Sequence, residues 1–282
     1  MKIHAPAKIN LVLDVVSKRP DGYHNVKMIM QTLELGDTVT VEATPAEDTC
    51  ITITSNSDSV PCNESNIAYK AAVAILDSAD KKCRVNIHIQ KNIPVAAGLA
   101  GGSTDGAAVL SALNSILGLG YSIEKLMELG AKFGADVPFC IMQGTALAEG
   151  TGTDLKQIAP YGEHTVLLVK PDIGVSTPWV YKNLKLDTVD HPDVDKYIEC
   201  ITNGEFENSF IHMGNVLESV TIKEYPVIDR IKYQMKEQGA VVSMMSGSGP
   251  TVFGIFDNKA RAEKAAEFFK KEFKEVIVTK TV

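Results

Sequence analysis

The sequence of 282 residues lacks the features that mark several classes of protein. It has only five cysteines, and no CxxC pair among them, so neither a disulfide framework nor a zinc knuckle is indicated. No run of about 18 apolar residues occurs, which excludes a membrane-spanning helix. Near the N-terminus, Asn10 and Asp14 interrupt the apolar run that a signal peptide would need. We therefore expect a cytoplasmic protein with reduced thiols and no membrane partner.

The sequence also lacks an excess of basic residues. Lysine and arginine number 28 against 35 aspartates and glutamates, which leaves a net charge of −7. Because nucleic-acid binding requires a basic surface that faces the phosphate backbone, a nucleic-acid partner is not expected. A small phosphorylated ligand needs only a few local donors and is compatible with this charge. With 45% hydrophobic and 22% charged residues, the composition is that of a folded chain, long enough for two domains.

Apolar patterning predicts strands and helices in two different arrangements along the chain. In the first part, the predicted strands cover residues 9–16, 26–35, 38–43, 50–54 and 85–89. Gly36-Asp37 suits a hairpin turn there, and Ser65 suits the N-cap of a helix. From residue 165, once the helices around 193–220 are set aside, the order is βαββαβ, which is typical of a ferredoxin-like domain. We predict an α+β protein with domains at 1–158 and 159–282.

The densest signal is a glycine-rich segment between a predicted strand and a predicted helix. Residues 94–108 read PVAAGLAGGSTDGAA, and an apolar helix face follows them. Small residues let the backbone approach an oxyanion, and the N–H groups and partial positive charge of a helix N-terminus attract it. No Walker A sequence or GxGxxG fingerprint is present, and a tight turn that needs glycine only for packing is the alternative. Four glycines within nine residues, followed by Ser103 and Thr104, favour a phosphate-binding loop.

Three other segments carry weaker signals when each is taken alone. Lys8 lies between Pro6 and an apolar run, where a solvated lysine at a strand edge is the simpler interpretation. Asp136 precedes an apolar segment and could form only an Asx turn. Residues 246–249, which read SGSG, fit a hairpin loop.

Together, these segments resemble in order and spacing the three motifs of the GHMP small-molecule kinases. The matching segments are residues 6–11 (PAKINL), 94–108 and 246–251 (SGSGPT). Residues 21–24 (DGYH) and 134–139 (GADVPF) resemble the branch of that family whose acceptor is a cytidine-diphosphate-linked methylerythritol. The resemblance spans essentially the whole chain. It implies an N-terminal domain of the ribosomal-protein-S5-like type and a C-terminal ferredoxin-like domain.

The resemblance also implies a reaction, in which the γ-phosphoryl group of ATP passes to the 2-hydroxyl of that acceptor, in the non-mevalonate route to isoprenoid precursors. Lys8 and Asp136 would be the catalytic pair: Asp136 would orient the hydroxyl and accept its proton, and Lys8 would stabilise the developing alkoxide. The nucleotide would be bound by Pro94, Ala96, Ala97, Gly98, Leu99, Ala100, Gly101, Gly102, Ser103 and Thr104, with Lys91 and Asn66 near the adenine. Mg²⁺ would be held mainly through the phosphates, and no protein ligand is assigned to it.

On the acceptor side, the resemblance implies that Asn10 and His24 read the sugar alcohol and the cytosine. The cytosine ring would lie between Tyr23 and Tyr181, with Trp179 as a rival for Tyr181, and Gly247, Ser248 and Gly249 would complete this side. Two alternatives are another GHMP kinase, of the mevalonate or homoserine type, and a non-catalytic GHMP-like ligand-binding regulator. A substrate without a base has no need of the stacking pair, and a regulator has no need of both Lys8 and Asp136.

Overall fold

The computed structural model describes residues 1–282, which form two compact units. Unit 1 contains Met1–Ala7, Leu35–Val95 and Ala100–Gln143, and unit 2 contains Lys8–Glu34, Ala96–Leu99 and Gly144–Val282. The units differ from the predicted sequential domains because strands β1 (Lys2–Lys18) and β2 (His24–Pro45) each contribute residues to both. The boundary at residue 158 stays a prediction.

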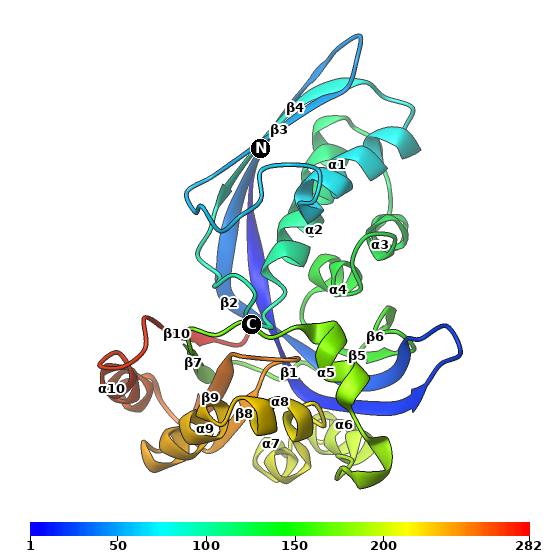
Figure 1. Cartoon of the computed structure of the whole chain (residues 1–282). Helices are drawn as coiled ribbons and strands as arrows, with labels where there is room; N and C mark the ends of the chain where they lie inside the picture. The colour runs from blue at the N-terminus through cyan, green and yellow to red at the C-terminus, as the bar shows by residue number, and fades with distance from the viewer. The chain divides into compact units, whose positions relative to one another are not determined.

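Unit 1 is a sheet with helices on one face (Figure 1). The C-terminal half of β2 pairs antiparallel with β4 (Cys83–Gln90), which pairs parallel with β3 (Cys50–Ser55). The helices are α1 (Ile67–Ser78), α2 (Gly101–Ile116), α3 (Ile123–Ala131) and α4 (Val137–Met142). Every second residue of β4 is buried in the core that these helices share with the sheet. This alternation is what predicts the strand from the sequence.

The hairpin predicted at Gly36-Asp37 is wrong, since β2 continues through both residues. A Cβ atom on Gly36 would collide with the ring of His4. The absence of a side chain on Gly36 therefore allows β1, which carries His4, to lie close to β2 here. The carboxylate of Asp37 accepts hydrogen bonds from the backbone N–H groups of Asn92 and Ile93, at 2.6 and 2.8 Å. Both residues therefore serve distant partners within a strand instead of a local turn.

The C-terminal part of unit 2 has the predicted ferredoxin-like order. Four antiparallel strands lie in the order β10-β7-β9-β8: β7 (Thr165–Lys170), β8 (Val242–Met245), β9 (Val252–Phe256) and β10 (Glu275–Lys280). Helices α9 (Val227–Glu237) and α10 (Lys259–Phe269) connect these strands and pack on the sheet (Figure 1). The βαββαβ prediction is confirmed. The remaining helices of this region are α5 (Thr177–Asn183), η1 (Leu186–Thr188), α6 (Val194–Thr202), α7 (Phe206–Ser209), η2 (Phe210–His212) and α8 (Glu218–Glu224).

Unit 2 also includes a hairpin that the sequence analysis did not predict. The N-terminal half of β2 pairs with β5 (Thr145–Glu149), which pairs with β6 (Asp154–Gln157). The end of the chain joins the same strand, since Leu33 forms a bridge with Thr281 and the Gln31 side chain donates to the carbonyl oxygen of Val282 at 2.7 Å. No helix of the structure has the length and apolar character needed to cross a membrane.

Candidate active site

The glycine-rich segment has a backbone shape that can hold an anion. Ala96, Gly98 and Ala100 all have positive φ, at 51°, 75° and 58°. Because left-handed alanines are strained by about 1–2 kcal/mol each, such residues are concentrated at functional sites. Helix α2 begins at Gly101, and its N-cap residue Ala100 supplies no side-chain hydrogen bond. The N–H groups of the first turn are therefore available to a ligand.

The turn at Gly98 is formed against the third motif, within unit 2. A Cβ atom on Gly98 would collide with the carbonyl oxygen of Ser246 and stand 3.1 Å from that of Gly249. The hydroxyl of Ser246 donates to the carbonyl oxygen of Gly98 at 3.0 Å. The structure thus brings together two of the segments that the sequence analysis singled out.

Lys8 lies next to the same loop. Its backbone N–H donates to the carbonyl oxygen of Leu99 at 3.1 Å. Its side chain is buried, with 5% of the residue exposed, and Nζ donates to Oδ1 of Asn10 at 2.7 Å. A buried ammonium needs such a partner to offset its lost hydration. The simpler interpretation from the sequence, a solvated lysine at a strand edge, is therefore wrong.

Asp136 belongs to unit 1, where it precedes α4 as the N-cap residue without a side-chain capping bond. Its segment lies beside the start of α2, because a Cβ atom on Gly134 would stand 3.8 Å from Oγ of Ser103. Within unit 1, the predicted base and the predicted phosphate-binding hydroxyl are therefore on neighbouring segments. The pairing of Lys8 with Asp136 stays a prediction, because the two residues belong to different units.

His24 and Tyr181 lie together in unit 2. Their ring centroids are 5.3 Å apart, and the ring planes are tilted by 40°. Burial and, to a smaller extent, the charge of Lys18 lower the pKa of His24, so its imidazole is neutral at neutral pH and can both donate and accept. Tyr23 is 66% exposed and Trp179 36% exposed. The structure thus joins two of the residues predicted to read the cytosine, while their role stays a prediction.

Helix α5, which carries Tyr181, is attached to the third motif. Oγ1 of Thr177, at the start of the helix, is hydrogen-bonded to Oγ of Ser248 at 2.6 Å. The carbonyl oxygen of Ser248 also accepts from the hydroxyl of Thr221 at 3.3 Å. The third motif therefore contacts both the loop at Gly98 and the helix of Tyr181.

Asn215 shapes this motif, and the sequence analysis missed it. Its buried Nδ2 donates to the carbonyl oxygens of Met245 and Gly247, both at 2.8 Å, and its Oδ1 accepts from the N–H of Leu217 at 3.0 Å. The asparagine thus satisfies donors and acceptors that would otherwise be buried alone. No local pattern reveals it, because its carbonyl partners lie 30 and 32 residues away in the sequence.

Asn66 has a structural task of its own in unit 1. It is the N-cap of α1, in place of the predicted Ser65, and its Oδ1 accepts from the N–H of Ala68 at 2.8 Å. Its Nδ2 donates to the carbonyl oxygen of Pro61 at 2.6 Å. A contact of Asn66 with adenine stays a prediction.

Lys91, the other residue expected near adenine, lies in a buried ion cluster. Its Nζ forms ion pairs with Asp37 and with Asp105, the latter at 2.8 Å. All three residues belong to unit 1. An adenine contact of Lys91 likewise stays a prediction.

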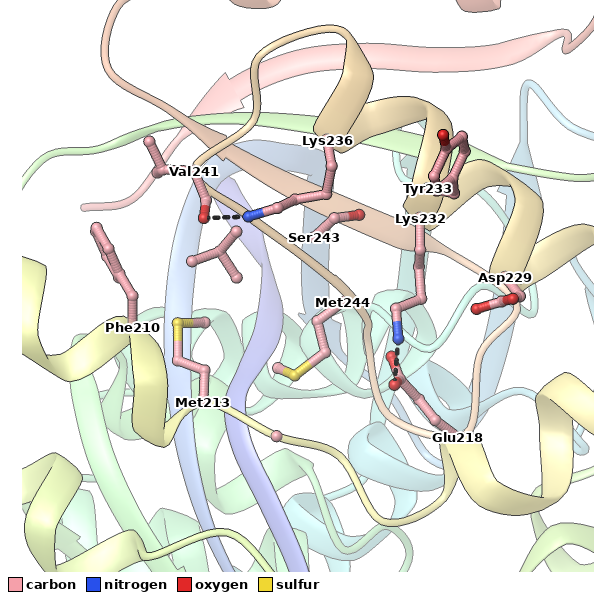
Figure 2. A pocket seen from close by; sticks show the side chains of 12 residues that line it. Phe210, Met213, Glu218, Asp229, Lys232, Tyr233, Lys236, Val241, Ser243 and Met244 are labelled. Carbon is pink, nitrogen blue, oxygen red and sulfur yellow. Dashed lines mark hydrogen bonds and ion pairs between the residues drawn. The ribbon is translucent and has the colours of Figure 1, made fainter. Parts of the chain in front are cut away.

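A separate cavity of about 440 Å³ lies in the C-terminal region (Figure 2). Its lining comes from the edge strand β8, from α8 and α9 and from the segments beside them. Its lysines already have partners, since Lys232 pairs with Glu218 and Lys236 donates to the carbonyl oxygen of Val241 at 2.7 Å. None of the predicted site residues lines this cavity.

The donors around the glycine-rich segment suit phosphate better than a bare cation. No three histidine, cysteine, aspartate or glutamate side chains are grouped so as to hold a metal ion. Backbone N–H groups and hydroxyls, which the segment does offer, are typical phosphate ligands. The residues present therefore fit a Mg²⁺ ion that is carried on the phosphates of a nucleotide.

Comparisons with known proteins identify the family. The models of the GHMP kinases N terminal domain and of the GHMP kinases C terminal match residues 66–144 and 193–275. The 4-diphosphocytidyl-2-C-methyl-D-erythritol kinase of Lachnoclostridium phytofermentans is 48% identical over 94% of this chain and 91% of that protein. The protein of the same name from Clostridium acetobutylicum is 47% identical over 100% of both chains. This chain belongs to the 4-diphosphocytidyl-2-C-methyl-D-erythritol kinase family of GHMP kinases.

Solved structures agree with this membership. The crystal structure of a 4-(cytidine 5'-diphospho)-2C-methyl-D-erythritol kinase matches this GHMP kinase with a TM-score of 0.85 at 30% identity, over 100% of this chain and 99% of that one. A homoserine kinase from Cytophaga hutchinsonii matches with a TM-score of 0.76 at 18% identity, over 100% of this chain and 94% of that one, which shows a shared fold alone. The predicted GHMP kinase fold and the predicted enzyme class, an ATP-dependent kinase, are confirmed.

Proposed function

We propose that this kinase transfers the γ-phosphoryl group of ATP to the 2-hydroxyl of 4-diphosphocytidyl-2-C-methyl-D-erythritol. The observation that carries the proposal is the contact of His24 with Tyr181, in the same unit as the buried Lys8 and the loop at Gly98. A cytosine ring offers a face for stacking on an aromatic side chain and an edge for hydrogen bonds to an imidazole. Mevalonate and homoserine have no base for such a pair to bind. From the sequence, we also infer a cytoplasmic location.

The chemistry at the acceptor would depend on Lys8, Asn10 and Asp136. Phosphoryl transfer passes through a loose transition state, so catalysis is mostly positioning and charge stabilisation. The Lys8 ammonium, directed by its hydrogen bond to Asn10, would stabilise the negative charge that develops on the attacking oxygen. The Asp136 carboxylate would orient the hydroxyl and accept its proton.

The nucleotide would be held by the segment from Gly98 to Thr104. Its backbone N–H groups and the start of α2 would bind the phosphates, and the hydroxyl of Ser103 would add a donor. Thr104 is fully buried, and its hydroxyl has no hydrogen-bond partner within the chain. This donor is costly to leave unpaired, and because it is enclosed, a phosphate oxygen would reach it only if the start of α2 shifts on binding. Mg²⁺ that enters with ATP neutralises charge on the β- and γ-phosphates when bound.

The test of this function is ADP release by the purified chain with ATP and Mg²⁺ against a panel of acceptors. We expect turnover with 4-diphosphocytidyl-2-C-methyl-D-erythritol and none with mevalonate or homoserine. Equal turnover of mevalonate would contradict the proposal. Nucleotide binding without turnover of any acceptor would favour a ligand-binding regulator instead.

The catalytic role of Asp136 has its own test. We expect Asp136→Asn to lower kcat by about 10²–10⁴-fold, the range for loss of a general base, with little change in the KM for ATP. Asp154→Asn, which makes the same change at an exposed position of β6, should leave both constants unchanged. An Asp136→Asn variant within a few fold of the parent chain would remove Asp136 from the mechanism.

A further inference from the structure

Three charged residues form a buried cluster at the start of helix α2, in unit 1. The Nζ atom of Lys91 lies between the carboxylates of Asp37 and Asp105, and the exposed fractions of these side chains are 7%, 0% and 3%. With both carboxylates ionised, the cluster carries a net charge of −1. Burial of charge is costly, and replacing such groups by apolar residues is often neutral or stabilising in other proteins. A buried cluster with an unbalanced charge is therefore expected to have a role other than stabilising the fold.

The cluster is connected to the glycine-rich segment at two places, its start and the first residue of α2. At the entry, Asp37 accepts from the N–H groups of Asn92 and Ile93, directly before Pro94. Where α2 begins, a Cβ atom on Gly101 would stand only 2.9 Å from Nζ of Lys91, so the ammonium packs against the first residue of the helix.

Asp105 is the member of the cluster whose ionised form is stabilised least by its surroundings. Its Oδ2 accepts from Lys91, but its buried Oδ1 has no hydrogen-bond partner. Burial raises the pKa of Asp105 to about 7, while Lys91 acts to lower it and Asp37 to raise it further. Another titratable group on this side is His4 of β1, whose ring lies against Gly36, next to Asp37. Helix α1 contributes the apolar Ile67, which packs against α2 at Gly106.

We propose that Asp37 and Asp105 are positioning residues for the nucleotide. Asp37 acts directly on the start of the glycine-rich segment, both carboxylates act through Lys91 on the start of α2, and the charge of the cluster sets how tightly the segment binds phosphate. The proposal rests on the proposed function, because it concerns how that site holds ATP. A neutral cluster leaves the positive end of α2 free to attract a polyanion, whereas a net charge of −1 opposes it. Nucleotide affinity therefore falls as Asp105 loses its proton.

The test is calorimetric titration of the full chain with MgADP, without acceptor, at about pH 6 and about pH 8.5, on either side of neutrality. The parent chain should bind MgADP more weakly at the higher pH. The ratio of its dissociation constants at the two pH values should be about tenfold larger than the same ratio for Asp105→Asn, whose cluster cannot change its charge. Ionisation of the nucleotide itself is the same for every variant, so this ratio reports the protein. Asp48→Asn is the matched control, because it makes the same change in an exposed ion pair with Lys82 in unit 1 and should follow the parent chain.

Parallel pH profiles for the parent chain and Asp105→Asn would overturn the proposal and leave the function standing, since a merely structural cluster changes affinity equally at both pH values. No binding of MgADP by the parent chain at either pH would instead contradict the proposed function. Asp105→Ser removes the same charge with a smaller side chain, in case the asparagine does not fit. Failure of both variants to fold would also contradict the proposal, because the proposal requires a fold that is stable with a neutral residue 105.

Discussion

The hydroxyl of Ser246 donates a hydrogen bond to the carbonyl oxygen of Gly98, 3.0 Å away, across 148 residues of sequence. The bond joins the third motif to the glycine-rich loop in unit 2. It is possible because Gly98 has a φ of 75° and no side chain, so the two backbones can approach closely. The geometry of the loop thus depends on a residue that is glycine for two separate reasons.

Gly98→Ala should therefore damage both stability and nucleotide binding. The left-handed backbone alone costs an alanine about 1–2 kcal/mol, and the collision with the carbonyl oxygen of Ser246 adds to this. Urea unfolding and the KM for ATP measure the two effects. Gly120→Ala is the control for backbone strain, since Gly120 has a φ of 67° and no atom within 4 Å of its added Cβ. Equal losses of stability in the two variants would show that the collision is relieved without cost.

Asn215→Ala should lower the free energy of unfolding by about 1–3 kcal/mol, because two buried carbonyl oxygens lose their shared donor. Asn215→Asp should be at least as damaging, since a carboxylate would face those oxygens where the amide donates to them. Both are measured by urea unfolding, with the exposed Asn208→Ala as control. A stable Asn215→Asp variant would contradict the assigned contacts.

The choice between Tyr181 and Trp179 is tested by acceptor binding. Tyr181→Ala should raise the KM for the cytidine-linked acceptor by roughly tenfold to a hundredfold, from the loss of about 1–3 kcal/mol of stacking, and Tyr181→Phe should retain most of the affinity. Trp179→Ala should have a smaller effect, because His24 contacts Tyr181. The reverse order of effects would assign the stacking role to Trp179.

Asp14 and His191 should make stability depend on pH. Oδ1 of Asp14 lies 2.7 Å from Nδ1 of His191, and the hydrogen bond to Asp14 raises the pKa of that imidazole. The stabilisation is therefore complete below the unfolded value of about 6.5 and is lost as the pH rises through the higher folded value. Asp14→Asn should lose more stability at about pH 5.5 than at about pH 8.5, by no more than about 1 kcal/mol, because the ring is partly exposed.

The measurement for this pair is the free energy of unfolding at the two pH values. In a His191→Gln background, the loss of stability caused by Asp14→Asn should no longer vary with pH. A pH dependence that survives in that background would assign it to other groups.

Local patterns predicted those elements whose cause is local. Val85, Ile87 and Ile89 alternate with exposed residues because only one face of β4 is buried, and the strand was predicted on that ground. Gly36-Asp37 misled the prediction because its partners, among them Asn92, are distant in the sequence. Ser65 and Asn66 are both good caps, and only the structure shows that Asn66 bonds to Ala68.

The same distinction holds for the site. The glycine-rich segment is continuous, so its composition alone indicates an anion-binding loop. The bonds from Lys91 to Asp37 and Asp105 join residues 54 and 14 positions apart, and no spacing in the sequence predicts these bonds. Asn215 was missed for the same reason, since its amide acts on a motif that comes later in the chain.

Because unit 2 takes in residues 8–34 as well as the C-terminal half of the chain, a fragment cut out at residue 159 would lack a piece of its own framework. Leu13 exchanges backbone hydrogen bonds with Gly214 and Val216, and Thr32 accepts from Val282. We expect residues 159–282 to fold only when residues 8–34 are also present. These residues could be supplied as a separate co-expressed chain or fused to the N-terminus of the fragment.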